Sequence, residues 1–254
     1  MTRTDLHRRL FGLYRTLPSP LQRVVRRAYD EYVDAGLVGP SYKRDFVSQF
    51  FPSDAAFDAL ETEFDRTDIE SVVADAQREH RRRTGHGRFA AINRYTTPRL
   101  YALVRTLEPD TVVETGVCNG VATFVILRAL EANGHGSLYS VDYPDEDRIP
   151  EGEQPGWFIP DDLRDRWSLT TGLSQEELPG VTADLDESVL FIHDTKAAIL
   201  DEELEIVWSR LADGAPVVAD DVHQSDVFGR VRDTYPGSSG FAAPNVGYLI
   251  KPAR

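Results

Sequence analysis

A short apolar stretch that runs into a glycine-bracketed turn is the clearest structural signal in the chain. Residues 111–113 are a β-branched run of the kind that parallel sheets bury on both faces. Glu114 follows, and Gly116 and Gly120 then bracket a turn where a side chain would obstruct close approach of the backbone. The pattern therefore predicts a buried strand that ends in a tight turn.

The residues after this turn repeat with a helical period. Apolar side chains recur on one side up to Asn133 and Gly134, a pair typical of a helix C-terminus, and they are Val121, Phe124, Val125, Leu127 and Leu130. A second apolar run, residues 137–141, predicts another strand, with Asp142 at its end. These elements make the first βαβ unit of a nucleotide-type α/β sheet. In such a unit the ligand lies over the carboxyl ends of the strands, and the acid binds ribose hydroxyls.

The remaining pattern predicts further strands at residues 167–170, 189–192 and 216–219, helices at 201–211 and 225–235, and a closing antiparallel hairpin around residues 244–245. Residues 143–162 contain four prolines and no periodicity, so they form a candidate lid above the strand ends. We predict an α/β fold: a Rossmann-like, seven-stranded, mostly parallel sheet with helices on both faces and a C-terminal antiparallel hairpin.

Helical patterns dominate the chain before this sheet. They cover residues 4–17, residues 54–64 after Ser53, residues 67–82 with Thr67 and Glu70 as a capping box, and residues 98–107. We therefore expect a helical N-terminal extension, residues 1–95, before an α/β domain, residues 96–254. The first helix is basic and amphipathic, so it either packs on the α/β domain or lies on an anionic membrane surface.

Charge and composition narrow the function classes. The 254 residues carry a net charge of −14, with lysine only at Lys43, Lys196 and Lys251, a balance that suggests a halophilic source. Up to Arg105 there are 18 Lys and Arg against 14 Asp and Glu, and after it 10 against 28, so the C-terminal part would repel nucleic acid. The single cysteine, Cys118, and the lack of a signal peptide or long apolar run predict a cytoplasmic protein.

The glycine spacing indicates which cofactor the turn would bind. A dinucleotide fold calls for G-x-G-x-x-G, whereas the chain has Glu114, Gly116, Cys118, Asn119 and Gly120, with an acid before the turn and no middle glycine. A carboxylate at this place repels a pyrophosphate and suits a cationic ligand. The segment resembles the E-x-G-x-x-x-G motif of class I S-adenosylmethionine-dependent methyltransferases. The resemblance implies that these five residues and Asp142 bind S-adenosylmethionine.

Three further stretches are similar to catechol-type O-methyltransferases, and the resemblance covers roughly residues 97–252. GLSQEELP, residues 172–179, is similar to a motif that lies beside the adenine, which implies that Ser174 and Gln175 bind there. ADDVHQSD, residues 219–226, resembles a metal-binding segment and implies Asp220 and Asp221 as ligands.

FIHDTKAAI, residues 191–199, falls where that family has a metal-binding aspartate followed by a lysine base. The match is imperfect, because His193 occupies the ligand position, Asp194 is displaced by one residue and Lys196 falls on the base. HDT also resembles a broader group of class I methyltransferases, several of which act on sugars. We expect Asp194, Asp220 and Asp221 to bind Mg²⁺, or else to be solvated acidic loops.

Methyl transfer to oxygen needs an aligned acceptor and, for a hydroxyl, removal of a proton. Lys196, His193 and His223 are the candidate bases, whereas a carboxylate acceptor such as a hexuronic acid needs none. We therefore expect O-methylation of a small-molecule or lipid-linked sugar acceptor, as in archaeal surface-glycoprotein glycans.

Three alternatives remain open for the function. A nucleic-acid methyltransferase could use the basic segment 78–99, but HDTK stands where amino-methylating enzymes have N/D-P-P-Y/F, which argues against a nucleic-acid partner. A ligand-binding scaffold protein on the same fold would not need the intact first motif. A dehydrogenase is disfavoured by the missing middle glycine.

Overall fold

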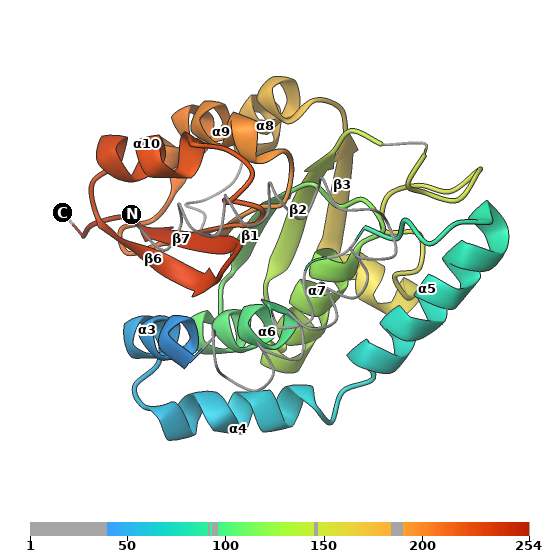
Figure 1. Ribbon diagram of the computed structural model, residues 1–254, viewed down its shortest axis with the longest axis horizontal. Coiled ribbons are helices and arrows are strands. Elements are labelled where there is room, and N and C mark those ends of the chain that lie inside the picture. Colours follow the sequence, from blue (N-terminus) through green and yellow to red (C-terminus); the bar gives the residue numbers. More distant parts are fainter. Residues whose placement is uncertain (1–39, 91, 93–95, 145–146, 184–189, 254) are drawn as a thin grey trace, which may run out of the picture.

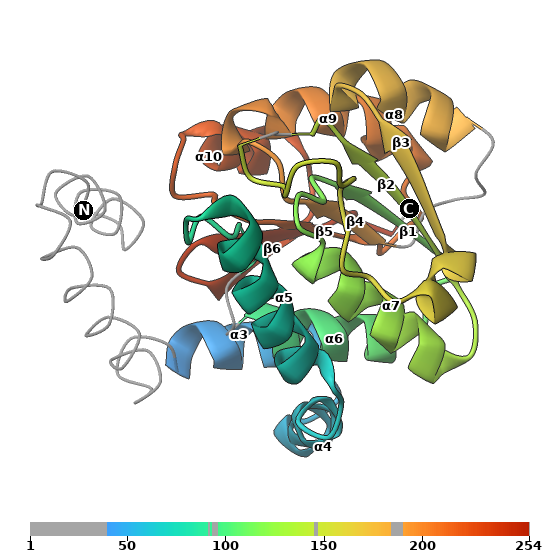
Figure 2. The same ribbon diagram turned by 90° about the vertical axis from the view of Figure 1, so that its right-hand side faces the viewer.

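The computed structural model describes residues 40–90, 92, 96–144, 147–183 and 190–253, which form one sheet with helices on both faces (Figures 1 and 2). Its strands are β1 (Thr111–Thr115), β2 (Ser137–Asp142), β3 (Trp167–Thr171), β4 (Leu190–His193), β5 (Pro216–Ala219), β6 (Ser238–Ala243) and β7 (Val246–Ile250). Its α-helices are α3 (Pro40–Phe50), α4 (Asp54–Phe64), α5 (Ile69–Thr84), α6 (Thr96–Leu107), α7 (Val121–Asn133), α8 (Ser174–Ala183), α9 (Leu200–Val207) and α10 (Val227–Thr234). Short 3₁₀ turns are η1 (Asp161–Arg166), η2 (Ala197–Ile199) and η3 (Trp208–Arg210).

The strand order confirms the predicted fold class. The seven strands run β3-β2-β1-β4-β5-β7-β6, with β1 to β5 parallel and β7 antiparallel to both β5 and β6. The order reverses at β1, where β2 lies on one side and β4 on the other. Crevices at such switch points, above the carboxyl ends of the strands, are where α/β folds bind ligands.

The central strands are buried from both sides, as their β-branched composition predicts. Side chains at alternate positions enter two separate apolar cores: Val112 packs with α6 and α7, while Val113 packs with α9 and α10. Figure 2 shows the same division, with α8, α9 and α10 on one face of the sheet and α6 and α7 on the other. The two cores hold the strand ends rigidly, which gives the site its support.

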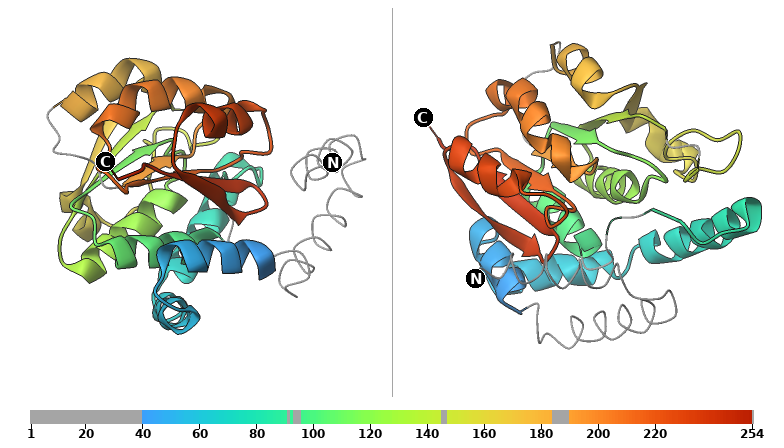
Figure 3. Two further views of the ribbon diagram at one scale, coloured as in Figure 1. Left: turned by 90° about the vertical axis from the view of Figure 1, so that its left-hand side faces the viewer. Right: turned by 45° about the horizontal axis from the view of Figure 1, so that its top comes forward.

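Helices α3 to α5, the described part of the predicted N-terminal extension, share the core of the sheet. Phe46 of α3 is 1% exposed and belongs to the same cluster as Val112, and its ring lies 6.2 Å from that of Tyr248 on β7. In Figure 3, α3 lies beside the hairpin of β6 and β7. The amphipathic segment predicted at residues 4–17 lies outside the described residues.

Of the two predicted helix starts at Ser53 and Thr67, the first forms as predicted and the second does not. Helix α4 begins after Ser53, whose Oγ accepts a hydrogen bond from Ala56 N at 3.2 Å, as an N-cap should. The capping box at Thr67 does not form, because the Thr67 amide still donates to Phe64 O in the turn that ends α4. Asp68 is the N-cap of α5 instead, and it makes no side-chain cap bond.

Candidate active site

The glycine turn after β1 is built without room for side chains. Gly116 has φ 86°, and a Cβ there would lie 2.2 Å from Asp194 O; Gly120 has φ 97°, and its Cβ would lie 2.6 Å from Gly156 Cα. Both positions therefore require glycine for two reasons: the backbone is left-handed, and another segment of the backbone lies too close for a side chain. Cys118 between them also has a positive φ, 48°. The turn leaves a compact backbone cradle at the switch point of the sheet.

Asp142 lies against this cradle. Its Oδ2 accepts a hydrogen bond from Cys118 N at 3.2 Å, and its own carbonyl accepts from Gly172 N at 2.9 Å. The side chain is 8% exposed, at the end of β2 where the sequence places the ribose-binding acid. Burial raises the pKa of the neighbouring Cys118 thiol to about 12, and the negative charge of Asp142 adds to this effect, so the thiol is neutral at physiological pH.

Glu114 is buried beneath the turn. Its Oε2 accepts hydrogen bonds from Thr123 Oγ1 at 2.8 Å and Ser140 Oγ at 2.7 Å, and the residue is fully buried. Burial raises the pKa of this carboxyl to about 7, against the two hydrogen bonds and with the help of the nearby Asp142 charge. A ligand above the turn would therefore sense Glu114 through its field rather than by contact. Its role in cofactor binding stays a prediction.

Five carboxyl groups gather at the carboxyl ends of the central strands: Glu114, Asp142, Asp194, Asp220 and Asp221. Burial raises the pKa of Asp194 well above its usual value, and the charges of the other four raise it further. Burial also raises the pKa of Asp220 to about 7, and the charge of Asp221 contributes. A cation bound at this edge would relieve the repulsion, which fits a positively charged ligand.

The described residues do not show the predicted Mg²⁺ site. Within the ranges that the structure describes, no group of three or more His, Cys, Asp or Glu residues could hold a metal ion. The reason is local, since Asp220 Oδ1 accepts hydrogen bonds from Asn245 Nδ2 at 2.7 Å and Asp221 N at 2.8 Å. Asp221 has a left-handed backbone, φ 54°, and its side chain is 44% exposed. Asp194, Asp220 and Asp221 are therefore neighbours that repel one another, and their role as metal ligands stays a prediction.

The loop between β2 and β3 is fastened over the glycine turn by Asn119. Asn119 Oδ1 accepts a hydrogen bond from Trp157 Nε1 at 2.9 Å, and its Nδ2 donates to Ala90 O at 3.3 Å. Arg83 of α5 pairs with Glu153 at 2.5 Å and lies over the Trp157 ring at 5.9 Å. Asn119 is fully buried, so it joins the turn, the loop and the chain after α5. The loop thus covers the turn, as expected for the candidate lid.

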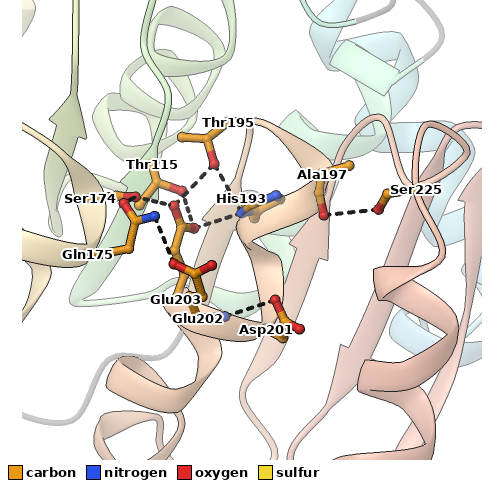
Figure 4. A network of polar contacts seen from close by, with 10 residues as sticks. All are labelled: Thr115, Ser174, Gln175, His193, Thr195, Ala197, Asp201, Glu202, Glu203 and Ser225. Carbon is orange, nitrogen blue, oxygen red and sulfur yellow. Dashed lines mark hydrogen bonds and ion pairs between the residues drawn. The ribbon is translucent and has the colours of Figure 1, made fainter.

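A buried polar network lies on the α9 side of the strand ends (Figure 4). His193, a candidate base, is fully buried, and its Nδ1 lies 2.7 Å from Glu203 Oε2. Ser174, a candidate adenine-binding residue, donates a hydrogen bond from its hydroxyl to Glu203 Oε1 at 2.5 Å. Gln175 donates to Glu202 Oε2 at 2.9 Å. An acceptor cannot reach the His193 ring in this conformation.

The other two candidate bases lie in the loops after β4 and β5. Lys196 is exposed, three residues beyond the end of β4, and is open to an acceptor. His223 is 5% exposed, and its Nδ1 lies 4.0 Å from Asp221 Oδ1. Of the three, Lys196 alone is both near the strand ends and open to solvent. The catalytic assignments remain predictions.

Sequence reasoning missed Glu203, the centre of the buried network. Its helix contains several acidic residues that look alike in the sequence, and only one of them is fully buried. The sequence spacing could have identified it, because Glu203 falls in the apolar stripe that Leu200, Leu204 and Val207 form at helical intervals. An acid inside such a stripe must find buried donors.

Comparison with known proteins finds one family that matches the central part of the chain. Residues 113–222, from within β1 to just beyond β5, match a family described as a methyltransferase domain. This part of the chain is therefore similar to a methyltransferase domain. The match includes the glycine turn, Asp142 and the aspartate pair after β5. Among curated proteins, none matches the chain.

Several solved structures resemble this chain in fold. A methyltransferase from Geobacter sulfurreducens is 22% identical, with a TM-score of 0.55 over 71% of this chain and 90% of that one. An SAH-bound methyltransferase from Podospora anserina is 14% identical, with a TM-score of 0.54 over 71% and 88%. An O-methyltransferase from Bacillus cereus in complex with SAH is 14% identical, with a TM-score of 0.50 over 83% and 97%. At these identities the likeness shows the fold alone.

Proposed function

We propose that this protein is an S-adenosylmethionine-dependent methyltransferase that acts on an oxygen acceptor. The observation that carries the proposal is the glycine cradle with Asp142 beside it, inside a segment that matches a methyltransferase domain. Two structural relatives, those from Podospora anserina and Bacillus cereus, hold SAH, the product of this cofactor. The five carboxyl groups at the strand ends give the cradle a field that favours a sulfonium and an ammonium group.

The residues of this chain would bind and orient the cofactor. Asp142 would accept hydrogen bonds from ribose hydroxyls, and the side-chain-free cradle at Gly116 would let the backbone approach closely. When bound, S-adenosylmethionine supplies an electrophilic methyl group on a positively charged sulfur. The loop fastened through Trp157 and Asn119 would exclude water from above the turn. Lys196, the exposed group beyond β4, would take up the proton of a hydroxyl acceptor when its side chain is in the neutral amine form.

For the acceptor, we propose a sugar or a hexuronic acid, free or lipid-linked. Support comes from α5, whose last turn carries Arg81, Arg82 and Arg83 and whose end is fastened to the loop above the glycine turn. An arginine-rich helix end beside the site suits an anionic group on the acceptor. The acidic, lysine-poor composition and the single cysteine support a salt-adapted cytoplasmic setting. Among the described residues, no helix is long and apolar enough to cross a membrane.

Calorimetric titration in concentrated salt tests the cofactor. We expect wild-type protein to bind S-adenosylmethionine and S-adenosylhomocysteine with micromolar affinity, and NAD not at all. Asp142→Ala should remove this binding, whereas Asp162→Ala, a control on the exposed η1 turn, should not. Absence of heat with both sulfur compounds, in a folded wild-type protein, would contradict the proposed function.

Transfer of a labelled methyl group then tests the acceptor class. Glucuronic acid, glucose and a single-stranded oligonucleotide would each be offered at equal concentration. Label in a base-stable ether or a base-labile ester on the sugars supports the proposal, and the two linkages distinguish hydroxyl from carboxylate transfer. Label in the oligonucleotide alone would favour the nucleic-acid alternative instead.

A further inference from the structure

Glu203 of α9 is a fully buried carboxylate with all its acceptor positions filled. Oε1 accepts from Ser174 Oγ at 2.5 Å and Thr195 Oγ1 at 3.1 Å, and Oε2 accepts from Thr115 Oγ1 and His193 Nδ1, both at 2.7 Å (Figure 4). A carboxylate has about four lone-pair sites. The group is therefore fully satisfied by four protein donors, although the residue is 0% exposed.

The negative charge of Glu203 is stable in this place. Burial alone would raise its pKa, but the hydrogen bond and the charge of His193, with the hydroxyls of Ser174 and Thr115, outweigh burial and hold the pKa below its usual value. Because the ionised carboxylate only accepts, His193 Nδ1 carries the hydrogen of their bond. No hydrogen-bond partner for His193 Nε2 occurs in the described part of the chain, and Figure 4 shows it pointing away from Glu203.

The four donors come from the ends of three different strands. Thr115 is the last residue of β1 and precedes Gly116; His193 ends β4 and, with Thr195, flanks Asp194; Ser174 begins α8 just after β3. Each donor is thus a chain neighbour of a residue predicted to bind the cofactor or to face the acceptor. Glu203 itself lies on the α9 side of the sheet, beneath these loops. One carboxylate therefore sets the spacing of three segments that a ligand would bridge.

We propose that Glu203 is a positioning residue of the methyltransferase site, which holds the β1 turn, the β4 loop and the start of α8 at the spacing that S-adenosylmethionine requires. This inference rests on the proposed function. Glu203 acts through Thr115, Ser174 and the His193–Thr195 segment, and it makes no contact with the ligand. The proposal also gives Ser174 a role different from the predicted adenine contact, because the Ser174 hydroxyl donates its hydrogen bond to Glu203.

The test compares Glu203→Gln with Glu205→Gln, an exposed glutamate on the same helix. Glutamine has nearly the same shape as glutamate, but its NH₂ group cannot accept hydrogen bonds. It would face two of the four donors, lose their hydrogen bonds and push the segments that carry them apart. We expect Glu203→Gln to weaken S-adenosylhomocysteine binding about tenfold or more, equal to about 1.4 kcal/mol. Glu205→Gln should change it less than about twofold. Titrations are run well below the unfolding temperature, with folding checked by circular dichroism.

A second pair of variants separates positioning from general stability. Thr115→Val keeps the shape and removes the donor, whereas Thr115→Ser keeps the donor. We expect Thr115→Val to weaken cofactor binding and Thr115→Ser to preserve it. In the Glu203→Gln background, Thr115→Val should weaken binding little further, because the two substitutions disturb the same Thr115–Glu203 hydrogen bond. Lower unfolding temperatures with unchanged affinity in Glu203→Gln would overturn the inference.

Hydrogen exchange without any ligand keeps the two proposals apart. In Glu203→Gln we expect faster exchange at residues 116–120 and 194–196, with no change in Glu205→Gln. A wild-type protein that fails to bind the cofactor contradicts the proposed function, while the exchange result still reports on the spacing of the three segments. Equal exchange in the two variants would contradict the positioning role itself.

Discussion

Replacement of Gly116 by alanine gives the sharpest test of the glycine cradle, because the chain contains a matched control. Gly116 and Gly134 have nearly equal φ angles, 86° and 80°. A left-handed backbone costs a non-glycine residue roughly 1–2 kcal/mol, and this cost is common to both sites. The surroundings differ, since a Cβ at Gly134 meets nothing within 4 Å, whereas at Gly116 it would lie 2.2 Å from Asp194 O.

The clash sets the difference between the two variants. Ordinary contact begins at 3.4 Å, so the backbone at Asp194 would have to move by about 1.2 Å. That movement strains the hydrogen bond from Asp194 N to Thr115 O, which is 2.8 Å long. Forced overpacking costs roughly 1–3 kcal/mol and a lost hydrogen bond roughly 0.5–1.5 kcal/mol. We therefore expect Gly116→Ala to lose about 2–4 kcal/mol more than Gly134→Ala.

Urea unfolding followed by circular dichroism, at one pH and one salt concentration, measures both losses. The cradle explanation also requires that Gly116→Ala weaken S-adenosylmethionine binding at temperatures where the variant is folded, and that Gly134→Ala leave it unchanged. Equal unfolding midpoints for the two variants would refute the reasoning, because they would mean that the loop after β4 accommodates the methyl group without a loss of folding free energy.

Two further predictions concern charge and the loop above the turn. The folded-state pKa of Glu114, about 7, lies above its usual 4.5, so its protonated form stabilises the fold at low pH and this stability is lost as pH rises through 7. The free energy of unfolding, measured in urea, should therefore fall between about pH 4.5 and 7, by up to about 3 kcal/mol for this group. Glu114→Gln should make the profile less steep, while Asp220, whose pKa is also raised to about 7, keeps part of the slope; an equally steep profile in that variant would contradict the assignment. Trp157→Phe removes the hydrogen bond to Asn119, so exchange at residues 151–159 should quicken by an amount that corresponds to about 1 kcal/mol. Trp208→Phe, which changes a ring packed on Tyr235 instead, should leave that segment unchanged, and equal effects of the two variants would argue against the fastening.

Much of the sheet could be predicted because its signals are local. The strand predicted at residues 216–219 matches β5 at both ends, and the helix predicted from Val121 ends at Asn133, where Gly134 adopts φ 80°. In both places the apolar pattern ends directly before a residue type that is common in turns, Asp220 after β5 and Gly134 after α7. Helix α8 was missed as an element, because Pro179 lies inside it and its apolar stripe is weak.

The site was harder to predict because its geometry depends on contacts between distant segments. Asp194, Asp220 and Asp221 follow neighbouring strands, so the sequence brings them together, but Asn245 from the hairpin determines how Asp220 is satisfied. The sequence makes His193 a candidate base or ligand, but its contact with Glu203, on another element, cannot be predicted from the sequence. Strand order places residues near one another, whereas burial and side-chain partners decide what each can do.

The position of β7 inside the sheet has a consequence for biosynthesis. It is the last described strand along the chain, yet it lies between β5 and β6 and is the partner that joins β6 to the rest of the sheet. Until Ile250 has left the ribosome, β5 is an unpaired edge and β6 has no neighbour, and unpaired edges promote association between chains. A nascent chain therefore stays vulnerable to aggregation until β7 has been synthesised, and deletion of β7 would remove an interior strand of the sheet.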